Sequence, residues 1–194
     1  MPFVDLGVGQ KAVAVSAGKN FSCAILNGGA VKCWGRNYAG QLGVGDVSAR
    51  GDDPNEMGAA LPNANLGLPA VDIVAGGYHA CAVLSTGALK CWGSNNDGVL
   101  GVGRLATGNN IALGDQVDEM GDMLPSIDLG TGVNVVEVAR GLYYGCALLS
   151  DGNIKCWGPN FAGQLGMGST DGGIGSRPSD MGDNLPTVDL GLEK

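Results

Sequence analysis

Six cysteines are the residues of this 194-residue chain whose type and spacing most directly suggest chemistry. They fall into three pairs, and within each pair the two thiols are ten positions apart: Cys23 and Cys33, Cys81 and Cys91, Cys146 and Cys156. A zinc site usually takes cysteines two to four residues apart, and a redox-active dithiol uses a C-x-x-C motif. The spacing fits neither, so it favours disulfides, with free buried thiols and a metal site as the alternatives.

Each cysteine pair brackets a short turn that ends in glycine, at residues 27–29, 85–87 and 150–152. If each turn closes a β-hairpin, the two cysteines lie directly opposite each other. Opposed residues of antiparallel strands have Cα atoms roughly 4.5–5.5 Å apart, and a disulfide accepts roughly 4.4–6.8 Å. Hairpin geometry therefore permits the bridges 23–33, 81–91 and 146–156.

The other residues with catalytic or ligand chemistry are scattered. His79 is the only histidine, and Asp97, Glu137 and Asp171 are carboxylates that nothing in the sequence ties together. Three acidic, glycine-rich stretches could hold Ca²⁺ through oxygen ligands or cap turns on a soluble surface. These stretches are residues 51–62, 114–125 and 175–186. We predict no catalytic residue, no cofactor and no metal site, with turn capping the preferred role of the carboxylates.

The elements that position these residues come from a threefold internal repeat. The repeated segments read CAILNGGAVKCWGRN, CAVLSTGALKCWGSN and CALLSDGNIKCWGPN, and the units close with LPNANLG, LPSIDLG and LPTVDLG. The tryptophans, Trp34, Trp92 and Trp157, hold one fixed place, 58 and 65 residues apart. Fixed placement beside Cys and Gly predicts packing between sheets rather than a row of sugar-binding rings. Phe21 and Tyr144 replace His79 in the other units, so His79 is expected to be structural too.

Apolar residues recur with a period of two within each unit, as in Val13 and Val15 or Val71 and Ile73, which is typical of half-buried strands. Each unit predicts three inner strands and an outer one in the LPxxxLG segment. Four short antiparallel strands per repeated unit predict an all-β fold of three tandem propeller blades, a partial or oligomer-completed propeller. The predicted blades are residues 8–67, 68–130 and 131–191, with an extra outer strand at 2–7.

Composition excludes several classes of protein. Glycine makes up 36 of 194 residues, yet 44% of the chain is hydrophobic, enough for a core. Eleven basic and 19 acidic residues give a net charge of −8 without a basic cluster, which argues against nucleic-acid binding. Apolar runs have strand length, so no membrane span is predicted. The start, MPFVDLG, has no basic or long apolar region, so no signal peptide is expected in this sequence.

The repeated run G-x-x-H-x-x-A-L-x-x-G-x-V-x-x-W-G-x-N-x-x-G-Q-L-G resembles the repeat of the regulator of chromosome condensation family. It begins here at Gly76-Gly77-Tyr78-His79 and continues to Trp92-Gly93-Ser94-Asn95, with counterparts in all three units. The sequence departs from the pattern at Val99, where the other units have Gln41 and Gln164. The resemblance implies a β-propeller, usually of seven blades, that serves as an interaction platform, and a packed, hydrogen-bonded role for His79.

The cysteine pairs resemble the bacterial exported branch of that family. This resemblance implies a non-enzymatic protein-interaction or structural module of an exported repeat protein, located outside the cell, at its surface or in the periplasm. The partner is expected to be a protein that the sequence does not identify. Two alternatives are a carbohydrate-active propeller enzyme, using residues such as Asp97, Glu137 and Asp171, and a regulator of a small GTPase.

The strand pattern also predicts open ends. Both the N-terminal segment 2–7 and the C-terminal segment 185–191 match the outer strand, and three blades cannot close a ring. Exposed blade faces favour association. We therefore expect either the neighbouring repeats of a longer array or head-to-tail association of copies, with a six-bladed ring of two chains the preferred closed form and a filament the other outcome.

Overall fold

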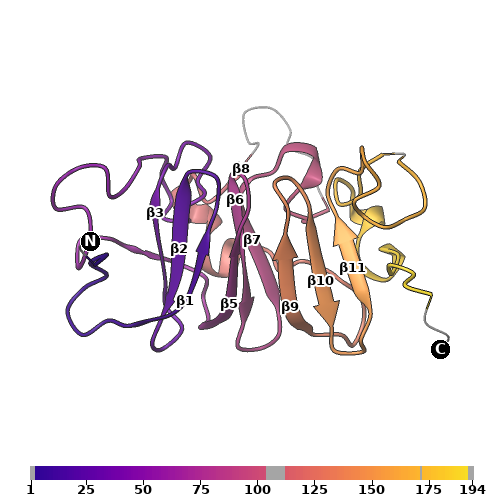
Figure 1. The fold of residues 1–194 in the computed structure, drawn as a ribbon, viewed down its shortest axis with the longest axis horizontal. Helices are drawn as coiled ribbons and strands as arrows, with labels where there is room; N and C mark the ends of the chain where they lie inside the picture. Colours follow the sequence, from indigo (N-terminus) through magenta and orange to yellow (C-terminus); the bar gives the residue numbers. More distant parts are fainter. Residues whose placement is uncertain (1–2, 104–111, 171, 192–194) are drawn as a thin grey trace.

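Three antiparallel β-sheets stand side by side along the chain, with the N- and C-terminal ends on opposite sides of the molecule (Figure 1). The computed structural model describes residues 3–103, 112–170 and 172–191. The all-β prediction of three consecutive propeller blades is confirmed, as a part of a propeller. Among the described residues no helix is long and apolar enough to cross a membrane.

Each sheet begins with three consecutive strands that pair in chain order. The first contains β1 (Ala12–Ala17), β2 (Phe21–Leu26), β3 (Val31–Gly35) and β4 (Asn63–Ala64). The second contains β5 (Ala70–Ala75), β6 (His79–Leu84), β7 (Leu89–Ser94) and β8 (Ala112–Leu113). The third contains β9 (Val135–Arg140), β10 (Gly145–Leu149) and β11 (Ile154–Trp157).

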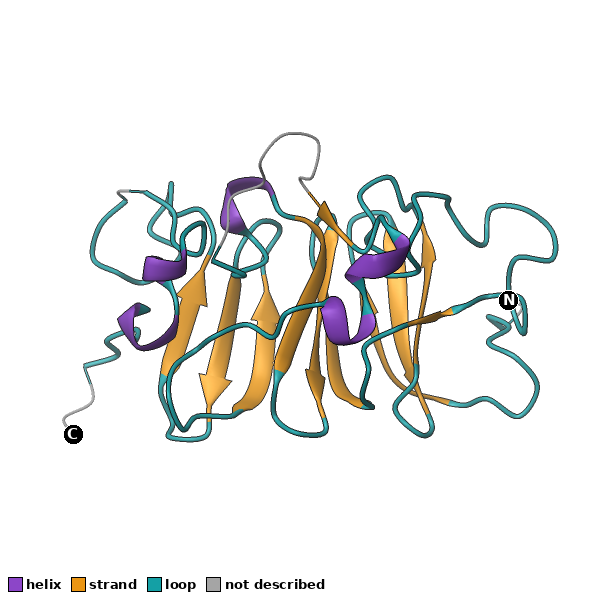
Figure 2. Cartoon of the chain, turned by 180° about the vertical axis from the view of Figure 1, so that it is seen from behind, coloured by secondary structure: helices purple, strands orange, loops and turns teal. Residues whose placement is uncertain are grey.

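Short 3₁₀ helices interrupt the long connections (Figure 2). They are η1 (Asn96–Gly98), η2 (Val117–Glu119), η3 (Gly121–Met123), η4 (Pro178–Asp180) and η5 (Gly182–Asn184). The sequence showed no capped helical pattern, and none is needed for single turns of three residues. Four of them, η2 to η5, lie within the acidic stretches 114–125 and 175–186.

The hairpins between the second and third strands have the predicted register. Cys23 lies opposite Cys33, and the other two pairs are opposed in the same way. Each turn ends in a glycine with positive φ: 85° at Gly29, 81° at Gly87 and 83° at Gly152. L-residues rarely adopt this conformation, so the glycine fixes where the turn ends and therefore which residues face each other.

The outer strand is shorter than the sequence suggests. In the first blade it is the two-residue β4, and in the others only the isolated bridges Lys90–Ser126 and Lys155–Thr187 remain. The second residue of each LPxxxLG segment is a proline, which has no N–H to donate to a neighbouring strand. The far end of the third strand has a second outer partner that was not predicted. This partner is Arg50 in the first blade, β8 in the second and Ile174 in the third.

The N-terminal segment, predicted as an extra outer strand at 2–7, forms no strand over its described residues 3–7. The described chain has no inner strands before this segment for it to pair with. Even so, it lies where an outer segment belongs: the N–H of Gly58 donates to the Asp5 oxygen at 3.0 Å, just as Gly121 donates to Asn65 at 2.8 Å. The segment therefore substitutes for the outer part of a preceding blade.

Candidate interaction surfaces

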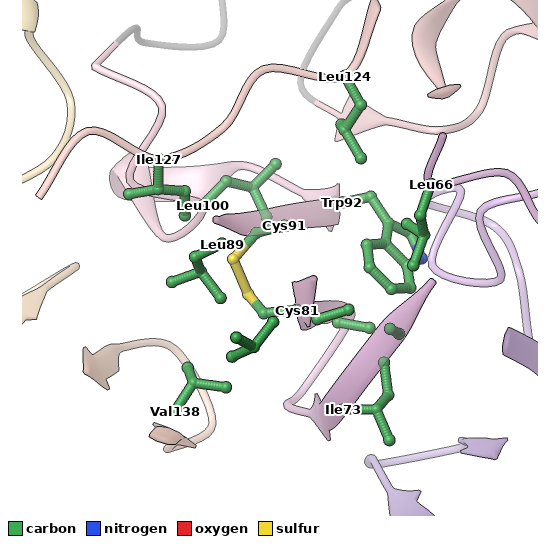
Figure 3. Close-up of a cluster of buried hydrophobic side chains, with 14 of the residues drawn as sticks. Leu66, Ile73, Cys81, Leu89, Cys91, Trp92, Leu100, Leu124, Ile127 and Val138 are labelled. Atoms are coloured by element: carbon green, nitrogen blue, oxygen red, sulfur yellow. A yellow bond between two sulfur atoms is a disulfide. The ribbon is translucent and has the colours of Figure 1, made fainter. Parts of the chain in front are cut away.

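A tryptophan joins the second blade to the first. The indole Nε1 of Trp92 donates to the main-chain oxygen of Gln41 at 3.0 Å, and both side chains are fully buried. Below the ring lies Gly43, where an added Cβ would come within 2.8 Å of the indole nitrogen. Glycine is therefore required for the ring to approach the loop. Figure 3 shows Trp92 in this core, next to Leu66 of the preceding blade.

The same joint recurs between the second and third blades. Trp157 Nε1 donates to the main-chain oxygen of Val99 at 3.1 Å, and a Cβ at Gly101 would lie 2.7 Å from the indole. Trp157 is also fully buried. Two successive joints thus use one geometry: a tryptophan at the end of the third strand sits on the glycine loop of the previous blade.

The first blade carries the tryptophan without the loop. Trp34 was predicted to be core but is only half-buried, because no glycine loop covers it. It lines a groove of about 580 Å³ with Phe3, Val15 and Ala24. Among the described residues its indole has no hydrogen-bond partner. The N-terminal segment covers one side of this groove and leaves the rest open.

The third blade carries the loop without the tryptophan. Gly166 is exposed, whereas its equivalents Gly43 and Gly101 are buried. Nearby Phe161 is 77% exposed. Its equivalent in the first blade, Tyr38, contacts Tyr78 of the second blade with ring centroids 5.3 Å apart. Each end of the molecule therefore carries one half of the joint that is complete twice inside it, with Val188 of the same blade beside Gly166.

Three lysines are buried, which the sequence analysis missed. Lys90 Nζ donates to the main-chain oxygens of Leu66 and Gly121, at 3.1 and 2.7 Å. Lys155 repeats this with Leu129 and Gly182, and Lys32 donates to Gly58. Each ammonium of the second and third blades thus ties a blade to the outer segment of the previous one. The signal was present in the sequence, because lysine occupies the position two residues before every tryptophan.

The six cysteines form the three predicted disulfides, 23–33, 81–91 and 146–156, and no cysteine is free. Figure 3 shows the central bridge between Cys81 and Cys91, surrounded by apolar side chains from two blades. Arg140 of the third blade reaches this bridge, and its guanidinium lies 2.7 Å from the Cys81 sulfur. Each bridge crosslinks two neighbouring strands of one blade. The bridges 23–33 and 81–91 lie within the hydrophobic core, whereas Cys146 of the third bridge is half-buried.

His79 is buried at 1% exposure, and its Nε2 has no hydrogen-bond partner. Burial, and secondarily the positive charge of Arg140, hold the pKa of His79 well below the usual value. The ring is therefore neutral at physiological pH. Among the described residues no hydrogen bond joins the ring to a nucleophile. The burial fits the packed role that the resemblance implies, whereas the hydrogen bond that it also implies is missing at Nε2.

The acidic stretches use their carboxylates on their own backbone. Glu56 Oε2 accepts the N–H groups of Gly51 and Asp53, at 2.7 and 3.1 Å. Glu119 does the same with Gly114 and Gln116 in the second unit. Within the described residues no group of three or more His, Cys, Asp or Glu side chains is placed to hold a metal ion. Glu56 and Glu119 thus cap the turns of their own stretches, whereas the Asp115 Oδ1 is buried without a hydrogen-bond partner in the described part of the chain.

The structure does not join the carboxylates that were considered for an enzyme. Asp97 lies in η1 and Glu137 in β9, both exposed. No hydrogen bond or ion pair joins these two in the part of the chain that the structure describes. Asp171 lies outside the described residues.

Models of the regulator of chromosome condensation (RCC1) repeat match this chain. One matches residues 12–41, 70–99 and 135–164, which are the inner strands and glycine loop of each blade. A second model of the same repeat matches residues 29–83, across the first boundary between blades. Together the two models cover more than half of the sequence.

The chain is also similar to individual proteins and solved structures. The ultraviolet-B receptor UVR8 of Arabidopsis thaliana is 31% identical over 163 residues, which are 84% of this chain and 33% of the receptor. Among solved structures, human WBSCR16 has a TM-score of 0.62 at 18% identity, over 95% of this chain and 42% of that one. Prp20p of Saccharomyces cerevisiae has 0.63 at 20% identity, over 92% and 38%. The chain thus spans about a third of the receptor's length.

Proposed function

The chain belongs to the RCC1-repeat family, and from that premise we propose that it is a non-enzymatic protein-interaction module that associates end to end through its outermost blades. One observation carries the proposal: Trp34 has no glycine loop, and Gly166 has no tryptophan. A second copy would supply both missing parts, as would the neighbouring repeats of a longer array. The joint uses different surfaces on the two copies, so it propagates in one direction and ends in a ring or a filament.

The geometry of the new joint follows from the two internal ones. Trp34 of one copy lies on residues 164–166 of the next, with Nε1 directed at the Gln164 oxygen as Trp92 is directed at Gln41. Phe161 then covers the turn that contains Asn20, the equivalent of Tyr78. Burying an indole and a phenyl ring stabilises the joint by roughly 1.5–3 kcal/mol each.

The N-terminal segment competes with this joint. Asp5 accepts the Gly58 N–H, and Asp189 is the equivalent residue of the C-terminal segment. Both make the same local turn, in which their Oδ1 accepts the N–H two residues later, at 2.9 and 2.8 Å. When the third blade of a second copy docks, the main-chain oxygen of its Asp189 replaces that of Asp5 as the acceptor of the Gly58 N–H. One of the two segments must therefore leave, which weakens the association.

The protein-binding role and the location are supported by different evidence. The crystal structure of the related Prp20p is described together with its binding to Gsp1p and histones, so a propeller of these repeats can serve as a protein-binding surface. Three disulfides in 194 residues are typical of oxidising compartments. We place the module outside the cell, at its surface or in the periplasm, as part of the bacterial exported branch.

Sedimentation velocity across the micromolar range tests the association. The unmodified chain is expected to sediment as dimers or larger species whose share rises with concentration. Trp34→Glu removes one half of the joint and Phe161→Glu the other, so each variant alone should be monomeric. An equimolar mixture retains one intact joint and should give a discrete dimer.

The control is Val117→Glu, which adds the same charge at an exposed valine in η2, away from both ends. It should associate like the unmodified chain. A chain that stays monomeric at every concentration would overturn self-association. Association that survives both Trp34→Glu and Phe161→Glu would show that copies meet through another surface.

A further inference from the structure

Three tyrosines and two cations gather at the edge of the sheets where β1, β5 and β9 end, the upper edge in Figure 1. Lys19 lies in the β1–β2 turn, Tyr78 in the β5–β6 turn and Tyr143 in the β9–β10 turn, while Arg36 and Tyr38 directly follow β3. We refer to these five residues as the tyrosine–cation patch. Each blade contributes to it, although none of the five is repeated in all three units.

Four of the five side chains contact one another, and Tyr143 lies in the neighbouring turn. Lys19 Nζ donates to the Tyr78 hydroxyl at 2.6 Å and lies 4.9 Å from the centre of its ring. The Tyr38 and Tyr78 rings are 5.3 Å apart and inclined by 56°. The Arg36 guanidinium lies over the Tyr38 ring at 5.3 Å. The two cations thus stand at either side of a pair of tilted rings.

The backbone under the patch is fixed by the joints between blades. The Lys19 N–H donates to the Gly76 oxygen, and the Gly77 N–H donates to the Leu142 oxygen, each at 3.1 Å. The Arg36 N–H donates to the Asn20 oxygen at 2.9 Å. A Cβ at Gly77 would lie 2.6 Å from the Leu142 oxygen, so the close stacking of the turns depends on glycine. The patch is therefore pre-organised, which reduces the entropy lost on binding.

The patch has an unusual charge for this protein. The chain has 19 acidic and 11 basic residues, yet neither Lys19 nor Arg36 pairs with a carboxylate among the described residues. The ion pair found among the described residues lies outside the patch and joins Arg50 and Asp46. Tyr38 is 51% exposed and Tyr143 46%. Exposed tyrosine and arginine are the side chains most enriched at energetic centres of protein interfaces.

We propose that the tyrosine–cation patch is a docking site for an acidic segment of another protein, whose carboxylates pair with Lys19 and Arg36 while its backbone and apolar groups pack on the tyrosine rings. Charge complementarity favours this partner. The protein is acidic overall, yet the patch presents two positive side chains that pair with no carboxylate among the described residues. Sugar stacking fits less well, since the Tyr38 and Tyr78 rings are inclined to each other and the Tyr78 hydroxyl accepts from Lys19. The patch borders the proposed end-to-end joint, because Phe161 of a second copy would cover the turn that contains both Lys19 and Asn20.

Fluorescence anisotropy with a labelled twelve-residue peptide rich in Glu and Asp tests the proposal on the full chain. The acidic peptide should bind, and the same peptide with Gln and Asn in place of the acids should bind at least about tenfold more weakly. Lys19→Glu and Arg36→Glu should each weaken binding of the acidic peptide by about tenfold or more. Tyr38→Ala should weaken it while leaving its salt dependence unchanged.

The matched control is Lys11→Glu, which makes the same charge change at an exposed lysine at the opposite end of β1. Equal losses for Lys11→Glu and Lys19→Glu would overturn the proposal, because net charge alone would then set the affinity. Peptide binding that does not depend on Lys19 or Arg36 would also overturn it, as would the absence of binding. Repeating the titration with Trp34→Glu separates this result from end-to-end association, since that variant keeps the patch.

Discussion

The indole nitrogen of Trp157 lies 3.1 Å from the main-chain oxygen of Val99, although the equivalent acceptor in the first joint belongs to a glutamine. The bond needs a carbonyl group and not a particular side chain. This explains why a valine can replace the glutamine of the repeat without disturbing the packing of the blades. The joint depends instead on the tryptophan and on the glycine beneath it.

Alanine substitution should separate the three tryptophans. Trp92→Ala and Trp157→Ala each remove a fully buried ring and should lower the free energy of unfolding by about 3–5 kcal/mol. Trp34→Ala should cost about 1 kcal/mol in the monomer, because its ring lines an open groove. Chemical denaturation at low protein concentration measures all three. Equal losses would mean that Trp34 is covered as well as the other two.

Removing one disulfide should destabilise the chain by roughly 2.5–3 kcal/mol, the chain-entropy value for closing about eleven residues. Replacing Cys81 and Cys91 by alanine should cost more than replacing Cys23 and Cys33, because the Arg140 guanidinium also loses its contact with sulfur. Thermal unfolding compares the two double variants. Non-reducing peptide mapping of the unmodified chain should find only bridges within repeats, and free thiols would contradict the pairing.

His79 should make stability depend on pH. Its pKa is depressed in the folded state, so the unfolded chain binds more protons between the folded pKa and about 6.5. Stability should therefore fall as the pH drops below about 6.5, by at most about 1.4 kcal/mol per pH unit. His79→Phe uses the residue of the first repeat and should flatten this part of the profile. An unchanged slope in that variant would assign the pH dependence to other groups.

The buried lysines should be more important for stability than exposed ones. Lys90→Met keeps the length of the side chain but leaves the oxygens of Leu66 and Gly121 without the ammonium, which should cost about 1–3 kcal/mol. Lys11→Met on the surface should stay within about 0.5 kcal/mol of the unmodified chain. Urea denaturation measures the free energy of unfolding of both variants. An unchanged free energy of unfolding in Lys90→Met would show that water satisfies these oxygens equally well.

The repeat made most of the fold predictable from sequence. Three matched cysteine pairs around glycine turns fix the hairpin register, because only one register places both cysteines of every pair opposite each other. The LPxxxLG outer strand was overestimated, since a segment can follow a strand edge while making a single ladder contact. The half-buried Trp34 could have been anticipated from the missing first neighbour, but equal spacing of the tryptophans suggested equal environments.

The candidate surfaces were harder to predict because they depend on contacts between blades. Lysine is normally exposed, and the carbonyl groups that hold Lys90 and Lys155 come from segments more than twenty residues away. Arg140 stands where the other repeats have Ala17 and Ala75, so the repeat pattern gave no reason to place it beside Cys81. The tyrosine–cation patch likewise combines turns whose proximity only the stacking of the sheets reveals.

The tryptophan-on-glycine joint gives the array a polarity and a unit of growth. Every blade presents a ring on one side and a receptive loop on the other, so a duplicated or transplanted blade would meet compatible neighbours at both of its boundaries. The chain could therefore lengthen by gene duplication one blade at a time without redesigning its core.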